Sequence, residues 1–385
     1  MNKAVIFGAG NIGRSFIGNI FSSNGMRVTF VDANPGLVNE LNTKKEYRIL
    51  IKRNKRADEE IMVKNFEAVH SSETNKIIKC LNDSDVCATS VGQGALSKVI
   101  PLIGESIKIR TQNSIPPLDI IIAENIRNGA NYFRKILKGN NFPENEAGLI
   151  ETSIGKMVPI MTDVDLADDP LVLHAEEYNT LILDRKGFRN MVPDFSEIKA
   201  VENIAAWVDR KLFIHNLGHA ASAYLGFVKY PKKKLIAEIL EDTEIKNQVH
   251  RVMAEASEAL LKEYPSDFTS EGLNAHIDDL LFRFQNKALG DTVFRVGRDL
   301  PRKLGRDDRI LGSIRLCLKH NTPFGEMLKV FYSALNFAAS DQAGEIFKPD
   351  ENFIRDFTES GTKNGLTDLC GLDFDKDSEL IDAIL

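Results

Sequence analysis

The chain has 385 residues, of which 43% are hydrophobic and 27% are charged, and its formal net charge is −6. This length exceeds one typical domain, so two domains are expected, and the composition is that of an ordinary globular protein. The acidic balance argues against a general nucleic-acid-binding protein, and no run approaches the roughly 18 apolar residues of a membrane helix.

The four cysteines show neither C-x-x-C spacing nor the density of a disulfide framework. This pattern favours a reducing compartment and argues against a structural zinc site. The first ten residues, MNKAVIFGAG, are interrupted by glycine too early for a signal peptide. We therefore expect a cytoplasmic protein that does not act at a membrane.

The first half of the chain alternates short apolar runs with segments of helical periodicity. This alternation predicts an α/β fold with a Rossmann-type, doubly wound parallel sheet. Three further runs between residues 147 and 192 are expected to extend that sheet, namely AGLIETSI, LVLHAEEY and TLILDR. The runs that predict the main strands are KAVIF (3–7), RVTFVD (27–32), DVCATS (85–90) and LDIIIAEN (118–125).

After residue 195 the periodicity becomes helical, and Ser196 with Glu197 is a plausible helix start. We expect a Rossmann domain for NAD over residues 1–195. A mainly α-helical domain carrying the substrate and catalytic groups is expected over residues 196–385.

The segment GAGNIGR places Gly8, Gly10 and Gly13 in a G-x-G-x-x-G pattern between a predicted strand and a predicted helix. Gly8 permits a tight turn, Gly10 lets a pyrophosphate approach the backbone, and Gly13 lets the helix pack on the strand. Asp32 ends the second strand, where a carboxylate can bind ribose hydroxyls and repel the 2′-phosphate of NADP. The alternative is a purely structural glycine turn.

NAD is therefore the expected cofactor, although Arg14 and Arg27 nearby leave the strictness of this preference open. The turn after DVCATS falls at another strand's carboxyl end, where a nicotinamide would lie. The predicted cofactor-binding residues are Gly8, Ala9, Gly10, Asn11, Ile12, Gly13, Arg14, Asp32, Ser90, Val91 and Gly92.

The segment KLFIHNLGHA (211–220) would place four polar side chains on one face of a regular α-helix, Lys211, His215, Asn216 and His219. A lysine among apolar residues tends to lose its proton and can act as a base near neutral pH. Asn216 could stabilise a developing alkoxide, and His219 could hold the substrate. Two alternatives stay open: a metal bound by the histidines at i and i+4, or a structural polar helix at a domain interface.

The spacing Lys, four residues, Asn, two residues, His resembles the signature of the polyol-specific long-chain dehydrogenases. Within this family, the chain resembles the members that interconvert mannitol 1-phosphate and fructose 6-phosphate, and the resemblance extends over nearly the whole chain. The segments that carry it are FGAGNIGRSFIG, RKLFIHNLGHAASAYLG and RVGRDLPRKL. The resemblance implies NAD, no metal, Lys211 as general acid and base, and Asn125 as a second oxyanion-stabilising asparagine. Two residues depart from the family pattern, Ser15 in place of a usual glycine and His215 in place of an apolar residue.

The segment RVGRDLPRKLGRDDR (295–309) concentrates cations in an acidic chain. Its glycine and proline predict an irregular loop, although a solvated surface is the simpler interpretation. The resemblance implies that Arg295 and Lys303 hold substrate hydroxyls, and we expect Arg298 and Arg302 to bind a phosphate. The partner would then be a small sugar phosphate, and the oligomeric state is left open. The alternatives are a reductase of an unphosphorylated polyol or hexuronate, or a non-catalytic dinucleotide sensor.

Overall fold

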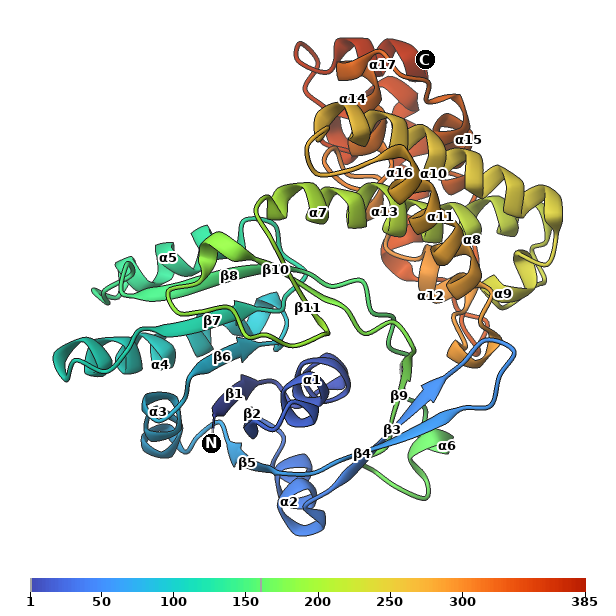
Figure 1. Ribbon diagram of the computed structural model, residues 1–385. Helices are drawn as coiled ribbons and strands as arrows, with labels where there is room; N and C mark the ends of the chain where they lie inside the picture. Colours follow the sequence, from blue (N-terminus) through green and yellow to red (C-terminus); the bar gives the residue numbers. More distant parts are fainter. Residues whose placement is uncertain (1, 160) are drawn as a thin grey trace. The chain divides into compact units, whose positions relative to one another are not determined.

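The computed structural model describes residues 2–159 and 161–385. Contacts within the chain divide it into two compact units, residues 1–208 and 209–385 (Figure 1). The first unit holds the β-sheets and the second is helical, as the sequence predicts.

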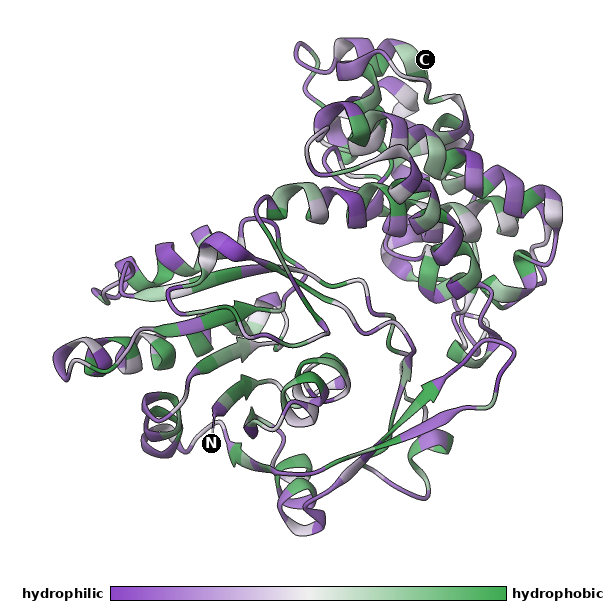
Figure 2. Cartoon of the chain, in the orientation of Figure 1, coloured by the Kyte–Doolittle hydropathy of each residue, from purple (hydrophilic) through white to green (hydrophobic). Residues whose placement is uncertain are grey.

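An eight-stranded sheet forms the first unit in the order β11-β10-β8-β7-β6-β1-β2-β5. Neighbouring strands pair in parallel from β8 through β7, β6, β1 and β2 to β5, whereas β10 pairs antiparallel with β8. Strands covered on both faces are continuously apolar, and Figure 2 shows most of this sheet in green. The bounds are β1 Lys3–Phe7, β2 Arg27–Asp32, β5 Phe66–His70, β6 Val86–Thr89, β7 Leu118–Ile122, β8 Ala147–Ser153, β10 Leu181–Asp184 and β11 Ile198–Val201.

Two hydrophobic cores lie on opposite faces of this sheet. Ala4 and Ile6 of β1 belong to one core, whereas Val5 and Phe7 belong to the other. This division confirms the doubly wound architecture, since alternate side chains of a strand point to opposite faces. The helical segments of this unit are η1 Gly13–Gly18 (a π-helix), α1 Asn19–Ser23, α2 Pro35–Lys44, α3 Thr74–Asn82, α4 Gln93–Gln112, α5 Gly129–Gly139, α6 Asp163–Leu166 and η2 Arg185–Gly187.

A second sheet has the order β4-β3-β9, with β3 Tyr47–Lys52, β4 Glu59–Val63 and β9 Leu173–Glu176. The sequence prediction that LVLHAEEY extends the main sheet is wrong, because β9 pairs in parallel with β3. The hairpin of β3 and β4 provides a competing edge for β9, and this edge lies far from it in the sequence.

The predicted helix start at Ser196 is also wrong. Residues Ile198–Val201 form β11, which pairs in parallel with β10, and the first helix of this region begins at Ile204. The backbone N–H of Leu181 donates to the Glu197 carbonyl at 2.8 Å, so pairing with β10 already begins at the expected helix start. β-Branched residues such as Ile198 and Val201 favour a strand wherever such an edge is present.

The second unit packs helices around α8, whose glycines allow close approach. A Cβ atom at Gly218 would lie 2.4 Å from the Met253 sulfur, so α10 packs directly on this part of α8. None of the helices in residues 2–159 and 161–385 is long and apolar enough to cross a membrane. Helix α7, Ile204–Arg210, spans the division between the two units. The bounds of the helices in the second unit are η3 Lys211–Asn216 (π), α8 Leu217–Lys229, α9 Ile236–Ile239, α10 Thr243–Glu263, α11 Ser270–Phe284, η4 Lys287–Leu289, α12 Val293–Gly297, α13 Leu300–Lys303, α14 Leu311–His320, α15 Gly325–Ala334, α16 Lys348–Asn364, η5 Gly365–Leu369 (π) and α17 Ser378–Ile384.

Candidate active site

The three glycines of the first turn have different steric surroundings. Gly8 has φ +95°, and a Cβ atom there would lie 2.4 Å from the Ser90 carbonyl oxygen. A Cβ atom on Gly13 would lie 1.9 Å from the Gly8 carbonyl oxygen, whereas one on Gly10 would meet no atom within 4 Å. Gly8 and Gly13 therefore serve close packing, and Gly10 leaves room for a group to approach the backbone.

Asp32 lies at the carboxyl end of β2 and contacts the glycine turn. One carboxylate oxygen accepts the Ala9 N–H at 2.7 Å, and the other accepts the Asn34 N–H at 2.9 Å. A carboxylate has about four acceptor sites, so capacity remains for ribose hydroxyls.

The turns after β1 and β6 meet, as expected for the point where the strand order reverses. Ser90 N–H donates to the Phe7 carbonyl at 2.8 Å, and the Ser90 hydroxyl lies 3.2 Å from the Gly8 carbonyl oxygen. Glu124, which sequence reasoning missed, accepts the N–H groups of Val91 and Gly92 at 2.8 and 2.9 Å. Its position two residues after the end of the buried strand β7 is the sequence feature that could have identified it as a site residue. Burial raises the pKa of Glu124, while these two hydrogen bonds lower it.

Arg14 supports the turn from inside the protein. Its guanidinium donates to the carbonyls of Ala9 at 2.6 Å and Leu171 at 2.7 Å and lies 5.5 Å from the Tyr47 ring centroid. These two hydrogen-bond acceptors are backbone oxygens of the interior, so the structure gives Arg14 a supporting position and not one beside the open side of Gly10.

The remaining predicted residues of this turn also have local partners. Asn11 donates from its side chain to the Pro159 carbonyl at 3.1 Å, and Ile12 packs against the hydrophobic core. The hydroxyl of Ser15, the departure from the family pattern, donates to the Asn11 carbonyl at 2.5 Å. This bond to the carbonyl four residues earlier satisfies the buried hydroxyl within its own helical turn.

The lysine segment does not form the regular α-helix that the sequence predicts. Lys211–Asn216 is a π-helix that leads into α8. A π-helix bonds residue i to residue i+5 and occurs frequently at functional sites. Lys211 and Asn216 are five residues apart, so this geometry places them about one turn from each other.

Lys211 has the electrostatic properties of a base. Burial, and then the charge of Arg309, lower the pKa of Lys211 to about 8. Arg309 is itself buried and donates to the Asp308 carboxylate at 2.7 Å. No sequence signal distinguishes Arg309 from the other arginines of its segment, because only its burial separates it from them.

His219 stacks on an aromatic ring, and its Nε2 lies near a carboxylate without forming a hydrogen bond to it. Its ring stacks on Phe284 with centroids 4.6 Å apart, and its Nε2 lies 3.2 Å from Asp291. Asp291, which sequence reasoning missed, also forms an ion pair with Arg295. Burial lowers the pKa of His219 well below 6.5, and Arg295 and other cations lower it further. The imidazole is therefore neutral at pH 7.

His215, the second departure from the family pattern, is buried with its ring centroid 5.5 Å from Phe284 and 6.4 Å from His219. Burial lowers the pKa of His215 well below 6.5, as do Arg283 and other cations. Within residues 2–159 and 161–385 there is no group of three or more His, Cys, Asp or Glu side chains that could hold a metal ion.

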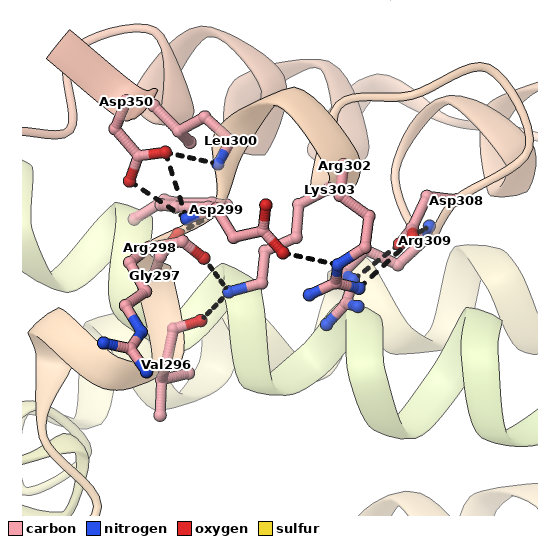
Figure 3. Close-up of polar contacts among 11 residues, drawn as sticks. Val296, Gly297, Arg298, Asp299, Leu300, Arg302, Lys303, Asp308, Arg309 and Asp350 are labelled. Carbon is pink, nitrogen blue, oxygen red and sulfur yellow. Dashed lines mark hydrogen bonds and ion pairs between the residues drawn. The ribbon is translucent and has the colours of Figure 1, made fainter. Parts of the chain in front are cut away.

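The basic segment is more regular than the predicted loop. It contains α12 and α13, separated by a break at Asp299 (Figure 3). The Lys303 ammonium is buried and donates to the carbonyls of Val296, at 2.7 Å, and Arg298. Burial, and then Arg309, lower the pKa of Lys303 to about 7.

The two arginines expected to bind phosphate have different surroundings. Arg302 donates to Asp299 at 2.5 Å and lies 3.5 Å from Asp308, so two carboxylates compensate its charge. The Arg298 guanidinium lies 5.5 and 5.6 Å from the ring centroids of Phe294 and Phe347, and in Figure 3 it is directed away from Lys303.

The predicted catalytic residues come from both units. Lys211, Asn216 and His219 lie on one continuous helical segment of the second unit, formed by η3 and α8. Arg295 in α12 and Lys303 in α13 belong to the same unit. Asn125 is exposed and follows β7 in the first unit. A glycine turn suited to a dinucleotide in one unit and a half-buried lysine with a lowered pKa in the other are features that a nicotinamide-dependent dehydrogenase needs.

The comparison with protein families agrees. Residues 2–197 match the mannitol dehydrogenase Rossmann domain, and residues 203–368 match the mannitol dehydrogenase C-terminal domain. The chain belongs to the mannitol dehydrogenase family, which confirms the resemblance seen in the sequence. It is an NAD-dependent oxidoreductase of polyols.

Among curated proteins, the chain is similar to mannitol-1-phosphate 5-dehydrogenases of two strains of Buchnera aphidicola subsp. Acyrthosiphon pisum, APS and Tuc7. Each is 31% identical over 342 residues, which cover 87% of this chain and 86% of the relative. Among solved structures, a substrate-free D-sorbitol dehydrogenase superposes with a TM-score of 0.80 at 15% identity, covering 99% of this chain and 91% of the other. A Pseudomonas fluorescens mannitol 2-dehydrogenase, in a ternary complex with NAD and D-mannitol, gives 0.78 at 14% identity, covering 100% and 90%. At these identities the two structures support the fold alone.

Proposed function

We propose that the enzyme interconverts D-mannitol 1-phosphate and D-fructose 6-phosphate. The observation that carries this proposal is a cation cluster of the second unit: the charges of Arg295, Lys303 and Arg309 all act on His219, and the charge of Arg298 acts on Arg295. Lys303 and Arg309 of this cluster are buried. A dianionic substrate would compensate this charge better than a neutral polyol. The name of the Buchnera relatives supports the same substrate.

The residues of the glycine turn fit a dinucleotide. Gly10 leaves its backbone open, Asp32 retains acceptor capacity, and the turn at Ser90–Gly92 is fixed against the first turn. NAD bound there supplies the hydride acceptor. Our proposed cofactor contacts are the residues predicted from the sequence, with Arg14 acting from behind the turn.

In the proposed mechanism Lys211 removes the hydroxyl proton of the polyol during oxidation and returns it during reduction. A pKa of about 8 suits both directions, since each protonation state is accessible near neutral pH. Asn216 and Asn125 donate hydrogen bonds to the developing alkoxide. Neutral His219, oriented by Phe284 and Asp291, holds a neighbouring hydroxyl.

For the remainder of the substrate, we propose that Arg295 and Lys303 bind hydroxyls and that Arg298 and Arg302 bind the phosphate. The two carboxylates on Arg302 make Arg298 the stronger phosphate ligand. The carboxylates of Asp299 and Asp308 also support a second candidate, a reductase of an unphosphorylated polyol or hexuronate. They compensate the charge of Arg302, one of the two arginines that the proposed phosphate site needs.

NADH oxidation with fructose 6-phosphate, fructose and tagaturonate, measured side by side, tests the proposal. We expect Arg298→Ala to raise the KM for fructose 6-phosphate at least about tenfold, roughly 1.4 kcal/mol, and to leave weak activity on fructose almost unchanged. The matched control is Arg355→Ala, which removes an exposed arginine paired with the adjacent Asp356.

Equal losses of Arg298→Ala on both sugars, or a wild-type preference for fructose or tagaturonate, would favour the second candidate. Activity should survive EDTA, whereas loss with recovery on adding zinc would favour metal binding by the histidines. The proposal places the enzyme in the cytoplasm, since Cys80, Cys87, Cys317 and Cys370 are all free thiols.

A further inference from the structure

Asp299 breaks the basic segment in a backbone conformation that is unfavourable for a residue with a side chain. Its φ and ψ are 76° and 50°, in the left-handed region. Such a conformation persists only where surrounding contacts fix it. The break separates α12 from α13 and so determines where the carbonyl groups on either side point.

A buried carboxylate of α16 fixes this break. Asp350 is 2% exposed, and its two oxygens each accept the Asp299 N–H at 3.0 Å (Figure 3). One of them also accepts the Leu300 N–H at 2.7 Å. Asp350 lies in the first turn of α16, where the positive end of the helix dipole stabilises a negative charge.

The same break orients the ammonium group of Lys303. With Asp299 left-handed, the carbonyls of Val296 and Arg298 converge on this ammonium from one side. An ammonium has three donors, so two are used here and one remains for a further acceptor. The direction of that third donor therefore depends on the backbone conformation at Asp299.

Asp350 also affects the charge of Lys303. Burial, Arg309 and Arg302 lower the pKa of this lysine, whereas the carboxylates of Asp299 and Asp350 raise it. Among these carboxylates, Asp350 is the buried one, and Asp299 is shared with Arg302. Asp350 thus favours the protonated, hydrogen-bond-donating form of the lysine.

We propose that Asp350 is a positioning residue for sugar binding, which acts by holding the left-handed turn at Asp299 and thereby aims Lys303 at a substrate hydroxyl. The inference rests on the proposed function only in assigning Lys303 to the substrate. It predicts that Asp350 affects the KM for the sugar and leaves cofactor binding unchanged.

The test compares Asp350→Asn with Glu255→Gln. Glu255 is a matched control, because its carboxylate also accepts two consecutive backbone N–H groups, those of Glu326 and Met327 at 3.0 and 3.1 Å. Each variant replaces one carboxylate by the amide of the same size. Hydrogen exchange of the backbone, Tm, and the KM values for fructose 6-phosphate and NADH are measured for both.

We expect Asp350→Asn to accelerate exchange in residues 296–304 and to raise the sugar KM about tenfold, with the NADH KM within twofold of wild type. Glu255→Gln should accelerate exchange near residue 326 and leave both KM values unchanged, even if Tm falls equally. In Asp350→Asn, a second substitution, Asp299→Gly, should lower the sugar KM by a larger factor than Asp299→Gly does in the wild-type background, because glycine adopts the left-handed conformation without a Cβ penalty. The wild-type background accounts for the release of Arg302 from Asp299.

An Asp350→Asn sugar KM no higher than that of Glu255→Gln would overturn the inference. So would a double variant whose sugar KM stays as high as in Asp350→Asn alone. If wild type prefers fructose or tagaturonate, the proposed function fails, and the same comparison with the preferred sugar still decides the role of Asp350.

Discussion

Asp32 has one role in the structure and a second role in our proposal, and a comparison of two cofactors can separate them. Its carboxylate supports the glycine turn through Ala9 and, in our proposal, binds the adenosine ribose. Loss of turn support would affect every dinucleotide equally, whereas loss of ribose binding and of charge repulsion affects NADH and NADPH differently.

We therefore expect Asp32→Ala to weaken NADH binding by about tenfold or more, as is typical for hydrogen bonds to a charged group, and to weaken NADPH binding less. Fluorescence titration with both cofactors measures this difference. Equal losses would show that the carboxylate acts through the glycine turn alone.

Arg309 tunes Lys211 through its charge. In our proposed mechanism the neutral amine of Lys211 is the base for polyol oxidation, so kcat/KM in that direction should rise with pH to a plateau, with an apparent pKa near 8. Arg309→Gln removes a cation that lowers this pKa. The profile should then shift to higher pH, with a several-fold lower kcat/KM at pH 7.

The pH profile of mannitol 1-phosphate oxidation measures this shift. The control is Arg315→Gln, which removes an arginine paired with Asp307 and Asp377 and is not among the groups that shift the Lys211 pKa. A profile of Arg309→Gln that coincides with that of the control would exclude Arg309 as the group that tunes the base.

At the scale of elements, the packing of η1 against the first turn can be tested by two glycine substitutions. A methyl group on Gly13 would overlap the Gly8 carbonyl, and neither backbone can move cheaply. We expect Gly13→Ala to cost about 1–3 kcal/mol of stability and to weaken NADH binding at least tenfold.

Gly10→Ala provides the contrast, because its methyl group would meet no protein atom within 4 Å. This variant should keep the wild-type Tm without cofactor and still lose NADH affinity. Thermal unfolding and fluorescence titration of both variants give the comparison. A Gly10→Ala protein with normal affinity would show that the pyrophosphate does not approach this backbone.

Several elements could be predicted from the sequence because their signals are local. The runs that became β1, β2, β6 and β7 are largely buried on both faces and therefore predominantly apolar. The two wrong predictions concern segments whose structure depends on partners distant in the sequence. Pairing with β3 takes β9 out of the main sheet, and pairing with β10 makes residues 198–201 a strand.

For the whole molecule, the division into a dinucleotide unit and a helical unit follows from the change in periodicity. Contacts divide the chain after Val208, and the two family matches meet between residues 197 and 203. We retain as a proposal that the NAD-binding domain covers residues 1–195 and the catalytic domain residues 196–385.

The sequence by itself determined the doubly wound fold, the cofactor class and the family, because glycine spacing, strand composition and the Lys-Asn-His spacing are properties of contiguous segments. Tertiary structure alone decided which cations are buried and which carboxylates reach them. Asp291, Arg309 and Asp350 are not marked by any local pattern; their importance comes from burial, which strengthens electrostatic interactions and is set by segments distant in the sequence.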